Sequence, residues 1–143
     1  MRLLGVRVRV RVRSRIGSRS LGLVVLANGG AESIRPCIVV DEEIAKRLGL
    51  WPAKDYKIYQ VEEASTESEV YVLENAAELK LVNDSEVLSS IIADLAIQKN
   101  LREPIITDIT IDELGIQVIG FSRGLWRHRS DPQDKVKRSY RQH

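Results

Sequence analysis

A turn built from Asn28, Gly29, Gly30 and Ala31 has residue types that could do chemistry, and it directly follows the apolar run 24–27. Only small residues pass through so tight a turn, which indicates a loop with a specific backbone conformation. Asn28, at the head of the turn, can donate and accept hydrogen bonds, but it has no basic lone pair that takes a proton from water at neutral pH. As an asparagine it therefore cannot serve as the general base of a hydrolase.

Asn28 precedes a glycine, and this neighbour leaves the backbone unhindered for the succinimide ring through which asparagine deamidates. One interpretation is that Asn28 becomes an aspartate after synthesis. The other is that Asn-Gly is a turn pair, held rigid in the folded loop and unreactive. We favour the turn pair.

Other residues that could carry chemistry are sparse. His128 and His143 lie in the basic C-terminal segment with no cysteine or acid at ligand spacing, so we expect neither a metal site nor a cofactor. Cys37 has no histidine nearby in the sequence and is interpreted as a buried structural thiol rather than a nucleophile. Glu32 is interpreted as a solvated loop residue, and Asp108 as the cap of a short helix.

A row of arginines precedes the turn. Arg7, Arg9, Arg11 and Arg13 alternate with apolar residues over 6–16, the period of a β-strand with one dry and one wet face. One interpretation is a basic ladder for nucleic acid. The other is a solvated face whose arginines pair with acidic parts of the same chain or of a second copy. We favour the second, because nucleic-acid-binding strands usually interleave aromatic residues and this segment has none.

The composition predicts one packed domain, because 43% of the 143 residues are hydrophobic. Both ends are basic and the middle, 20–122, is acidic. No apolar run is long enough to span a bilayer, and the alternating N-terminus lacks the apolar centre of a signal peptide. We therefore expect no membrane partner. A single cysteine, which cannot form an internal disulfide, favours a cytoplasmic location.

Hydrophobic periodicity and turn residues predict a mainly β chain with one or two short helices. A helix is expected between Asp41 and Gly49, because acids follow its start, bases precede its end and glycine can stop it. Segment 85–98 has helical spacing but strand-like composition, and we interpret it as a strand. The expected strands are 6–16, 18–27, 33–40, a hairpin over 56–73, 78–82, 85–98, 105–106 and a hairpin over 116–128, followed by a tail, 127–143, without regular structure.

The order of these segments resembles the retropepsin-like aspartic proteases of clan AA. In that family a strand leads into Asp-Thr/Ser-Gly-Ala, and residues 28–31 fall on those four positions. A helix ending Leu-Gly-Leu matches 48–50, and a second helix ending Leu-Gly-apolar matches 114–116. The resemblance extends over about residues 14–126, and the order and spacing of the motifs carry it.

The resemblance implies a single closed β-barrel domain over 1–126, with 1–16 as its arginine-rich first strand, and a homodimer in which the Asn28 loops meet at the axis. It also implies a flap at the hairpin tip: Ser65, Thr66, Glu67 and Ser68. An aspartic protease needs two carboxylates that share a proton, and a dimer supplies one from each chain. Here the acid is replaced by Asn28.

Two further departures concern the loop itself. Gly29 lacks the hydroxyl found at its position in the family. The family also has an apolar-apolar-Gly segment before its second helix, and the corresponding residues here are Ile105-Ile106-Thr107. We therefore expect a non-catalytic homodimer that binds an extended peptide in its groove by strand addition. The alternatives are an aspartic endopeptidase, if Asn28 deamidates or another acid substitutes, and a nucleic-acid-binding protein that uses the basic termini.

Overall fold

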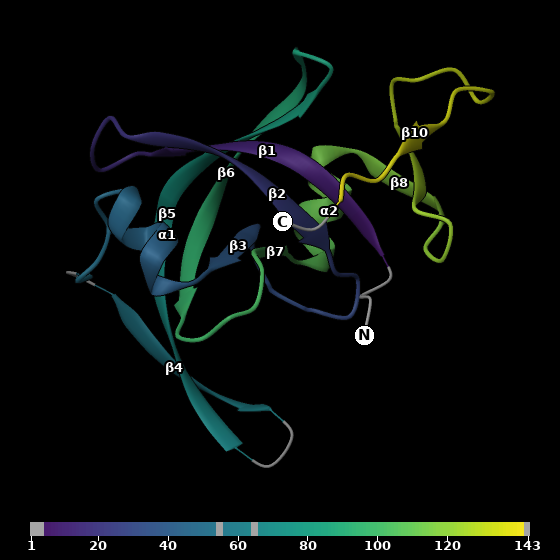
Figure 1. The fold of residues 1–143 in the computed structure, drawn as a ribbon. Coiled ribbons are helices and arrows are strands. Elements are labelled where there is room, and N and C mark those ends of the chain that lie inside the picture. Colours follow the sequence, from purple (N-terminus) through teal and green to yellow (C-terminus); the bar gives the residue numbers. More distant parts are fainter. Residues whose placement is uncertain (1–4, 54–55, 64–65, 142–143) are drawn as a thin grey trace.

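The computed structural model describes residues 5–53, 56–63 and 66–141, with only the backbone described for 59–63 and 66–68. The protein is mainly β, with a seven-stranded sheet, a separate three-stranded sheet and two short helices (Figure 1). The large sheet contains β1 (Val6–Ser14), β2 (Ser20–Ala27), β3 (Cys37–Val40), β4 (Lys57–Glu63), β5 (Thr66–Asn83), β6 (Glu86–Gln98) and β7 (Ile105–Ile106). The remaining elements are β8 (Ile116–Gly120), β9 (Leu125–His128), β10 (Lys137–Arg138), α1 (Glu42–Arg47) and α2 (Asp108–Leu114).

The strands of the large sheet are ordered β1-β2-β7-β3-β6-β5-β4, and β1 also pairs with β5. Successive pairings therefore lead from β1 through β2, β7, β3, β6 and β5 back to β1. Among the described strands, β4 pairs with β5 alone, and the hairpin that it forms with the first part of β5 projects from the rest of the domain (Figure 1). The expectation of a mainly β domain with few short helices is confirmed. Within the described ranges, neither helix is long or apolar enough to cross a bilayer.

Alternation along β1 is confirmed, because its four valines are fully buried whereas Arg9, Arg11 and Arg13 are exposed. Arg7 departs from the pattern and is only 5% exposed. Its guanidinium forms a two-point ion pair with Glu103, from Nε to Oε2 at 2.9 Å and from Nη2 to Oε1 at 2.8 Å. The partner carboxylate lies 96 residues away, so the local pattern does not reveal this pair.

The predicted punctuation of α1 is confirmed. The Asp41 side chain caps the helix by accepting from the Ile44 amide at 2.9 Å, and Gly49 has the left-handed φ of 74° that ends it. In α2 the expected cap, Asp108, is corrected, because Thr107 occupies the capping position and Asp108 is the first helical residue. The Asp108 carboxylate instead accepts from the Ile109 amide at 2.7 Å.

Segment 86–98 forms the predicted strand, β6. The predicted division of 66–83 into the second arm of a hairpin and a separate strand is wrong, because β5 continues through both. A bulge between Leu73 and Ala77 absorbs the irregularity, and Asn75 within it has a left-handed φ of 52°. Asparagine tolerates this conformation better than most residues, so the strand bends rather than ends.

The prediction that 127–143 lacks regular structure is wrong for the described part of that tail. Strand β9 continues through His128 and pairs with β8 and β10. The buried His128 ring lies 3.0 Å from the Leu114 carbonyl through Nε2 and 2.7 Å from the Ser130 hydroxyl through Nδ1. Buried polar contacts, together with the fully buried Trp126, order a segment that has few apolar residues.

A pocket beside the Asn28 turn

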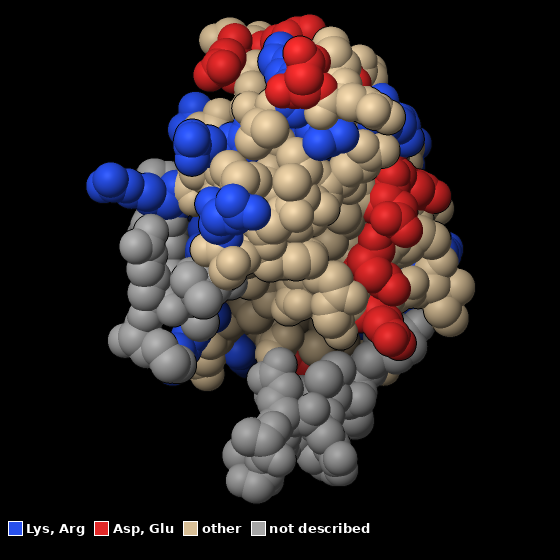
Figure 2. All heavy atoms as spheres, turned by 90° about the vertical axis from the view of Figure 1, so that its right-hand side faces the viewer, with Lys and Arg blue, Asp and Glu red and all other residues tan. Residues whose placement is uncertain are grey.

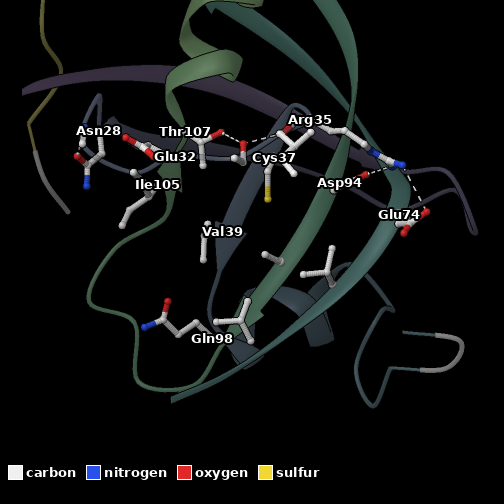
Figure 3. Close-up of a pocket in the computed structure, with 17 residues that line it drawn as sticks. Asn28, Glu32, Arg35, Cys37, Val39, Glu74, Asp94, Gln98, Ile105 and Thr107 are labelled. Carbon is white, nitrogen blue, oxygen red and sulfur yellow. Dashed lines mark hydrogen bonds and ion pairs between the residues drawn. The ribbon is translucent and has the colours of Figure 1, made fainter. Parts of the chain in front are cut away.

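A pocket of about 720 Å³ opens between the loop after β2 and the strands β3, β5 and β6 (Figure 3). Asn28 lies at one end, and Arg35, Asp94 and Glu74 lie at the opposite end (Figure 3). The pocket therefore extends along the sheet away from the turn. Its lining comprises Asn28, Gly30, Ala31, Glu32, Ser33, Ile34, Arg35, Cys37, Val39, Val70, Val72, Glu74, Asp94, Ala96, Gln98, Ile105 and Thr107.

The floor of the pocket is an apolar cluster, separate from the main core, formed by Cys37, Val39, Val70, Val72 and Ala96. Strand register brings these side chains together, because Val39 and Val72 both lie opposite Ala96 on β6. Alternate residues of a strand share a face, so the next residues along these strands turn into the core instead. The floor is thus a small, preformed apolar surface surrounded by polar groups.

Backbone hydrogen bonds fix the turn that closes the near end. The Asn28 amide donates to the Ile106 carbonyl at 3.1 Å, which ties the turn to β7. The Asn28 side-chain oxygen accepts from the Gly30 amide at 3.1 Å, and its carbonyl accepts from the Ala31 amide at 3.0 Å. The side chain thus stabilises its own turn, as asparagine does in Asx turns.

A chain of hydroxyl groups lies beneath the loop. The Thr107 hydroxyl lies 2.6 Å from the Ser33 hydroxyl and 2.7 Å from the Thr110 hydroxyl. At the two ends, Ser33 contacts the Arg35 carbonyl at 2.7 Å and Thr110 contacts the Cys37 carbonyl at 3.0 Å. Thr107 therefore links the loop before β3 to helix α2.

We expect Thr107→Val to lower the free energy of unfolding by about 1–3 kcal/mol, because the Ser33 and Thr110 hydroxyls lose their shared neighbour in a buried site. The shape of the side chain is nearly unchanged, so the loss reports the hydroxyl alone. Urea unfolding of the variant measures it. The control is Ser122→Ala, which removes a hydroxyl at an exposed position and is expected to change the free energy of unfolding by less than about 0.5 kcal/mol.

The far end of the pocket is a polar cluster around Arg35. Its guanidinium bonds to the Asp94 carboxylate, to Glu74 at 3.3 Å and to the Asn75 side-chain oxygen at 3.2 Å. Asp94 also accepts from the Asn75 amide at 2.8 Å, so the bulge of β5 provides part of the site. A hydrogen bond from Lys57, with its positive charge, lowers the pKa of Glu74, and Arg35 contributes in the same direction. These contacts hold the rim in place.

Cys37 lies in the floor and is 8% exposed. Burial raises the pKa of its thiol to about 12, and the negative charge of Asp94 adds to this increase. The thiolate is the reactive form of cysteine, so the side chain acts as a small apolar group at neutral pH. This agrees with its interpretation from the sequence as a structural thiol.

The raised pKa predicts that Cys37 reacts very slowly with a disulfide reagent at pH 8 in the folded protein. Absorbance at the wavelength of the released aromatic thiol measures the rate. The same reagent added in concentrated urea serves as the control and should react rapidly and completely, because unfolding returns the pKa to about 8.5. Equal rates in the two conditions would contradict the prediction.

The structure brings some of the predicted site residues to the pocket and leaves others away from it. Asn28, Gly30 and Ala31 line it, whereas the exposed Gly29 does not. In the predicted flap, Ser65 lies outside the described residues. The backbone of Thr66, Glu67 and Ser68 pairs with the end of β4.

Sequence reasoning missed the far end of the pocket, including Arg35 and Asp94, which are 59 residues apart in the chain. An acid inside the otherwise apolar run 91–97 was the signal that could have indicated it, because buried acids usually have a partner. Among the described residues, no group of three or more His, Cys, Asp or Glu side chains is placed to hold a metal ion.

The fold and the pocket together define a mainly β, single-domain protein with an apolar pocket beside a turn of small residues. No protein-family model matches the chain, and no curated protein matches it. The interpretation of the pocket therefore depends on the residues that line it.

Proposed function

We propose that the protein is a non-catalytic, retropepsin-like homodimer that binds an extended peptide in this pocket. The observation that carries the proposal is an apolar floor that begins beside the Asn28 turn and is surrounded by polar groups. Apolar surface with a few fixed polar groups is typical of ligand sites. An apolar side chain of the peptide would occupy the floor, and its backbone would meet the rim.

The order of elements supports the retropepsin-like part of the proposal. Strand β2 leads into the Asn28 turn, α1 is followed by Leu48-Gly49-Leu50, and a hairpin of β4 and β5 comes next. Strand β7 then precedes α2, which is followed by Gly115 and Ile116. Strand pairings that return to β1 agree with the closed barrel that the resemblance implies.

The chemistry of the pocket supports the absence of catalysis. The aspartic-protease reaction needs a carboxylate that takes a proton from water, and Asn28 supplies an amide. Of the acids that line the pocket, Asp94 and Glu74 are ion-paired with Arg35 at the far end. Glu32 is exposed to solvent.

The sheet supports peptide recognition by strand addition. Among the described strands, β4 pairs with β5 alone, so its other edge retains backbone donors and acceptors. A peptide strand that pairs with such an edge gains backbone hydrogen bonds, and pockets for alternate side chains give specificity. The apolar floor uses residues of β5, the neighbour of β4, including Val70 and Val72.

The surface supports a dimer. Figure 2 shows a broad uncharged area with basic side chains on one side of it and acidic side chains on the other. A two-fold axis that runs along this uncharged area, between its basic and acidic sides, would place the basic side chains of one copy against the acidic side chains of the other. Ile34, in the loop after the Asn28 turn, is 95% exposed, which is unusual for a large apolar residue unless another surface covers it.

Peptide binding is tested by fluorescence anisotropy with fluorescein-labelled octapeptides that carry a central leucine or phenylalanine and polar flanks. Ala96→Trp fills the floor and is expected to weaken binding by at least about tenfold, or about 1.4 kcal/mol. The matched control is Ile92→Trp, which adds an aromatic group on the same face of β6 at an exposed position outside the pocket lining. Equal affinity in both variants would contradict binding in the pocket.

The same peptides test the peptidase alternative, and sedimentation tests the dimer. Wild-type protein incubated with them at acidic and neutral pH is expected to leave them intact by mass spectrometry, and an Asn28→Asp variant shows whether the amide alone accounts for this. Cleavage by wild-type protein would contradict the proposal, and peptide mapping of residue 28 would then identify deamidation. Sedimentation is expected to show a dimer that Ile34→Glu dissociates, and a wild-type monomer would remove the dimer from the proposal.

A further inference from the structure

We propose that the outward face of β1 binds the phosphate backbone of a single-stranded nucleic acid. The arginine face consists of Arg9, Arg11 and Arg13 of β1 together with Lys80 of β5, which lies opposite Arg11. None of these residues lines the pocket, so this proposal does not depend on the function proposed for the pocket.

Strand geometry spaces the arginines of the face regularly. Alternate residues of a strand lie about 6.6 Å apart and point to the same side. The buried valines between the arginines fix the register, because a slip by one residue would place arginines in the core. The arginines therefore leave the strand at regular intervals, comparable to the spacing of successive phosphates along one nucleic-acid strand.

Two purely structural roles could explain an arginine row, and neither accounts for the whole of this face. Charged residues often protect an edge strand from pairing with other molecules, but from Arg9 to Arg13 strand β1 pairs with β2 on one side and β5 on the other. The second explanation, pairing with acids of the same chain, holds for Arg7 and for Arg13, which contacts Glu78 at 3.3 Å. It leaves the rest of the row unexplained.

One acid offsets part of the positive charge on the face: Glu78 contacts Arg13 at 3.3 Å and Lys80 at 3.8 Å. In strand register with Arg9, Arg11 and Arg13, β2 contributes Val24, Gly22 and Ser20, and β5 contributes Val82, Lys80 and Glu78. Glu78 is thus the one acid in register among the described residues. The Arg11 side chain is exposed and makes neither a hydrogen bond nor an ion pair with the described residues. Gly22, its neighbour on β2, leaves open space above the sheet.

An aromatic ring lies at one end of the row although β1 itself contains none. Tyr140, from the C-terminal segment, lies with its ring centroid 4.9 Å from the Arg9 guanidinium carbon. The Tyr140 amide donates to the Arg7 carbonyl at 2.9 Å, so the ring is anchored to the same strand. Proteins that bind single strands combine a basic track for the backbone with aromatic rings on which bases stack.

The width of the face favours a single strand over a duplex. The three arginines form one row, about 13 Å long, on a single β-strand. Such a row can follow one phosphate backbone, whereas a duplex presents two backbones separated by a groove. The face is therefore expected to contact about three phosphates.

The test is fluorescence anisotropy of wild-type protein with fluorescein-labelled oligo(dT) between about 20 and 200 mM salt. Three phosphate contacts predict a slope of about −2 for the logarithm of the association constant against the logarithm of salt concentration. The triple variant Arg9→Ser, Arg11→Ser, Arg13→Ser is expected to lose at least about tenfold in affinity at low salt and most of the slope. Circular dichroism confirms that this variant of exposed residues remains folded.

A charge-matched control removes three exposed basic residues elsewhere, by Arg47→Ser, Arg123→Ser and Lys135→Ser, and is expected to retain the affinity and the slope. Tyr140→Ala is expected to weaken binding by about tenfold without changing the slope, because stacking releases no counterions. Absence of oligo(dT) binding at low salt, or equal losses in the two triple variants, would overturn the proposal.

Two further probes test the choice of partner. A DNA duplex of the same length is expected to compete more weakly than oligo(dT), and equal competition would overturn the assignment to a single strand. Vesicles of phosphatidylserine and phosphatidylcholine are expected to bind no more strongly to wild-type protein than to the triple variant. Binding to such vesicles without binding to oligo(dT) would assign the face to a membrane surface and overturn the proposal.

Discussion

Glu103→Ala is expected to lower the free energy of unfolding by about 3–5 kcal/mol, because it leaves the Arg7 guanidinium buried without its carboxylate partner. The two side chains are 5% and 9% exposed and meet through two hydrogen bonds. In the wild-type protein the hydrogen bond to Glu103 raises the pKa of Arg7. The guanidinium stays charged in the variant as well, because arginine is protonated at neutral pH even without a carboxylate partner. Urea unfolding at neutral pH measures the loss.

The exposed pair of Arg13 and Glu78 provides the matched control. Its side chains are 45% and 22% exposed, and Glu78→Ala is expected to cost less than about 1 kcal/mol. Replacing both members of the buried pair, by Arg7→Met and Glu103→Leu, should recover most of the stability lost by Glu103→Ala, because no charge remains buried. Equal losses for Glu103→Ala and Glu78→Ala would contradict the prediction.

The buried pair also connects β1 to the pocket. Glu103 immediately precedes Pro104, whose carbonyl accepts from the Leu26 amide at 2.9 Å, and Ile105 and Ile106 of β7 follow. Strand β7 in turn holds the Asn28 turn through the Ile106 carbonyl. Loss of the ion pair should therefore loosen the near end of the pocket before the far end, which depends on Arg35.

Sequence patterns predicted the elements whose determinants are local. Alternation is sufficient for β1 because valine and arginine alternate along nearly all of the strand. Asp41 and Gly49 delimit α1 by interactions within a few residues of the helix ends. The Asn28 turn was likewise recognised from its small residues. It does line a pocket, although the pocket extends far beyond it.

The features that the sequence did not reveal depend on partners distant in the chain. Arg7 follows the same alternation as Arg9 and yet is buried, because Glu103 compensates its charge. The continuity of β5 depends on a bulge that Asp94 stabilises from the neighbouring strand. A pattern within one segment contains no information about such contacts, so it places the backbone better than it places the polar side chains.

The described part of the C-terminal segment shows the same limit, and it leads to the second large expected effect. Its polar composition suggested a tail without structure, but Lys137 and Asp131 form a buried ion pair, with side chains 5% and 9% exposed. The Asp131 carboxylate also accepts from the His128 amide at 2.9 Å. Lys137→Met keeps most of the side-chain volume and is expected to lower the free energy of unfolding by about 3 kcal/mol at pH 7.

The pH dependence separates loss of the ion pair from loss of packing. Burial alone raises the pKa of Asp131, but hydrogen bonds from Lys137 and from the His128 amide outweigh it and lower the pKa below its ordinary value. A carboxyl group with a lowered folded-state pKa contributes stability above its unfolded pKa of about 3.9 and loses that contribution as the pH falls through the folded-state value. The difference between wild-type protein and Lys137→Met should therefore shrink as the pH falls below about 4.

Lys135→Met is the control for this experiment, because it removes the same charge two residues away at an exposed position and is expected to change stability by less than about 0.5 kcal/mol. Other carboxyl groups titrate over the same range, but they do so in all three proteins and cancel in the differences. A loss that stays constant from pH 7 to acid would mean that Lys137 acts through the packing of its aliphatic chain near Trp126 rather than through its charge. A loss that shrinks with protonation of Asp131 would show that one ion pair orders a segment with too few apolar residues to order itself.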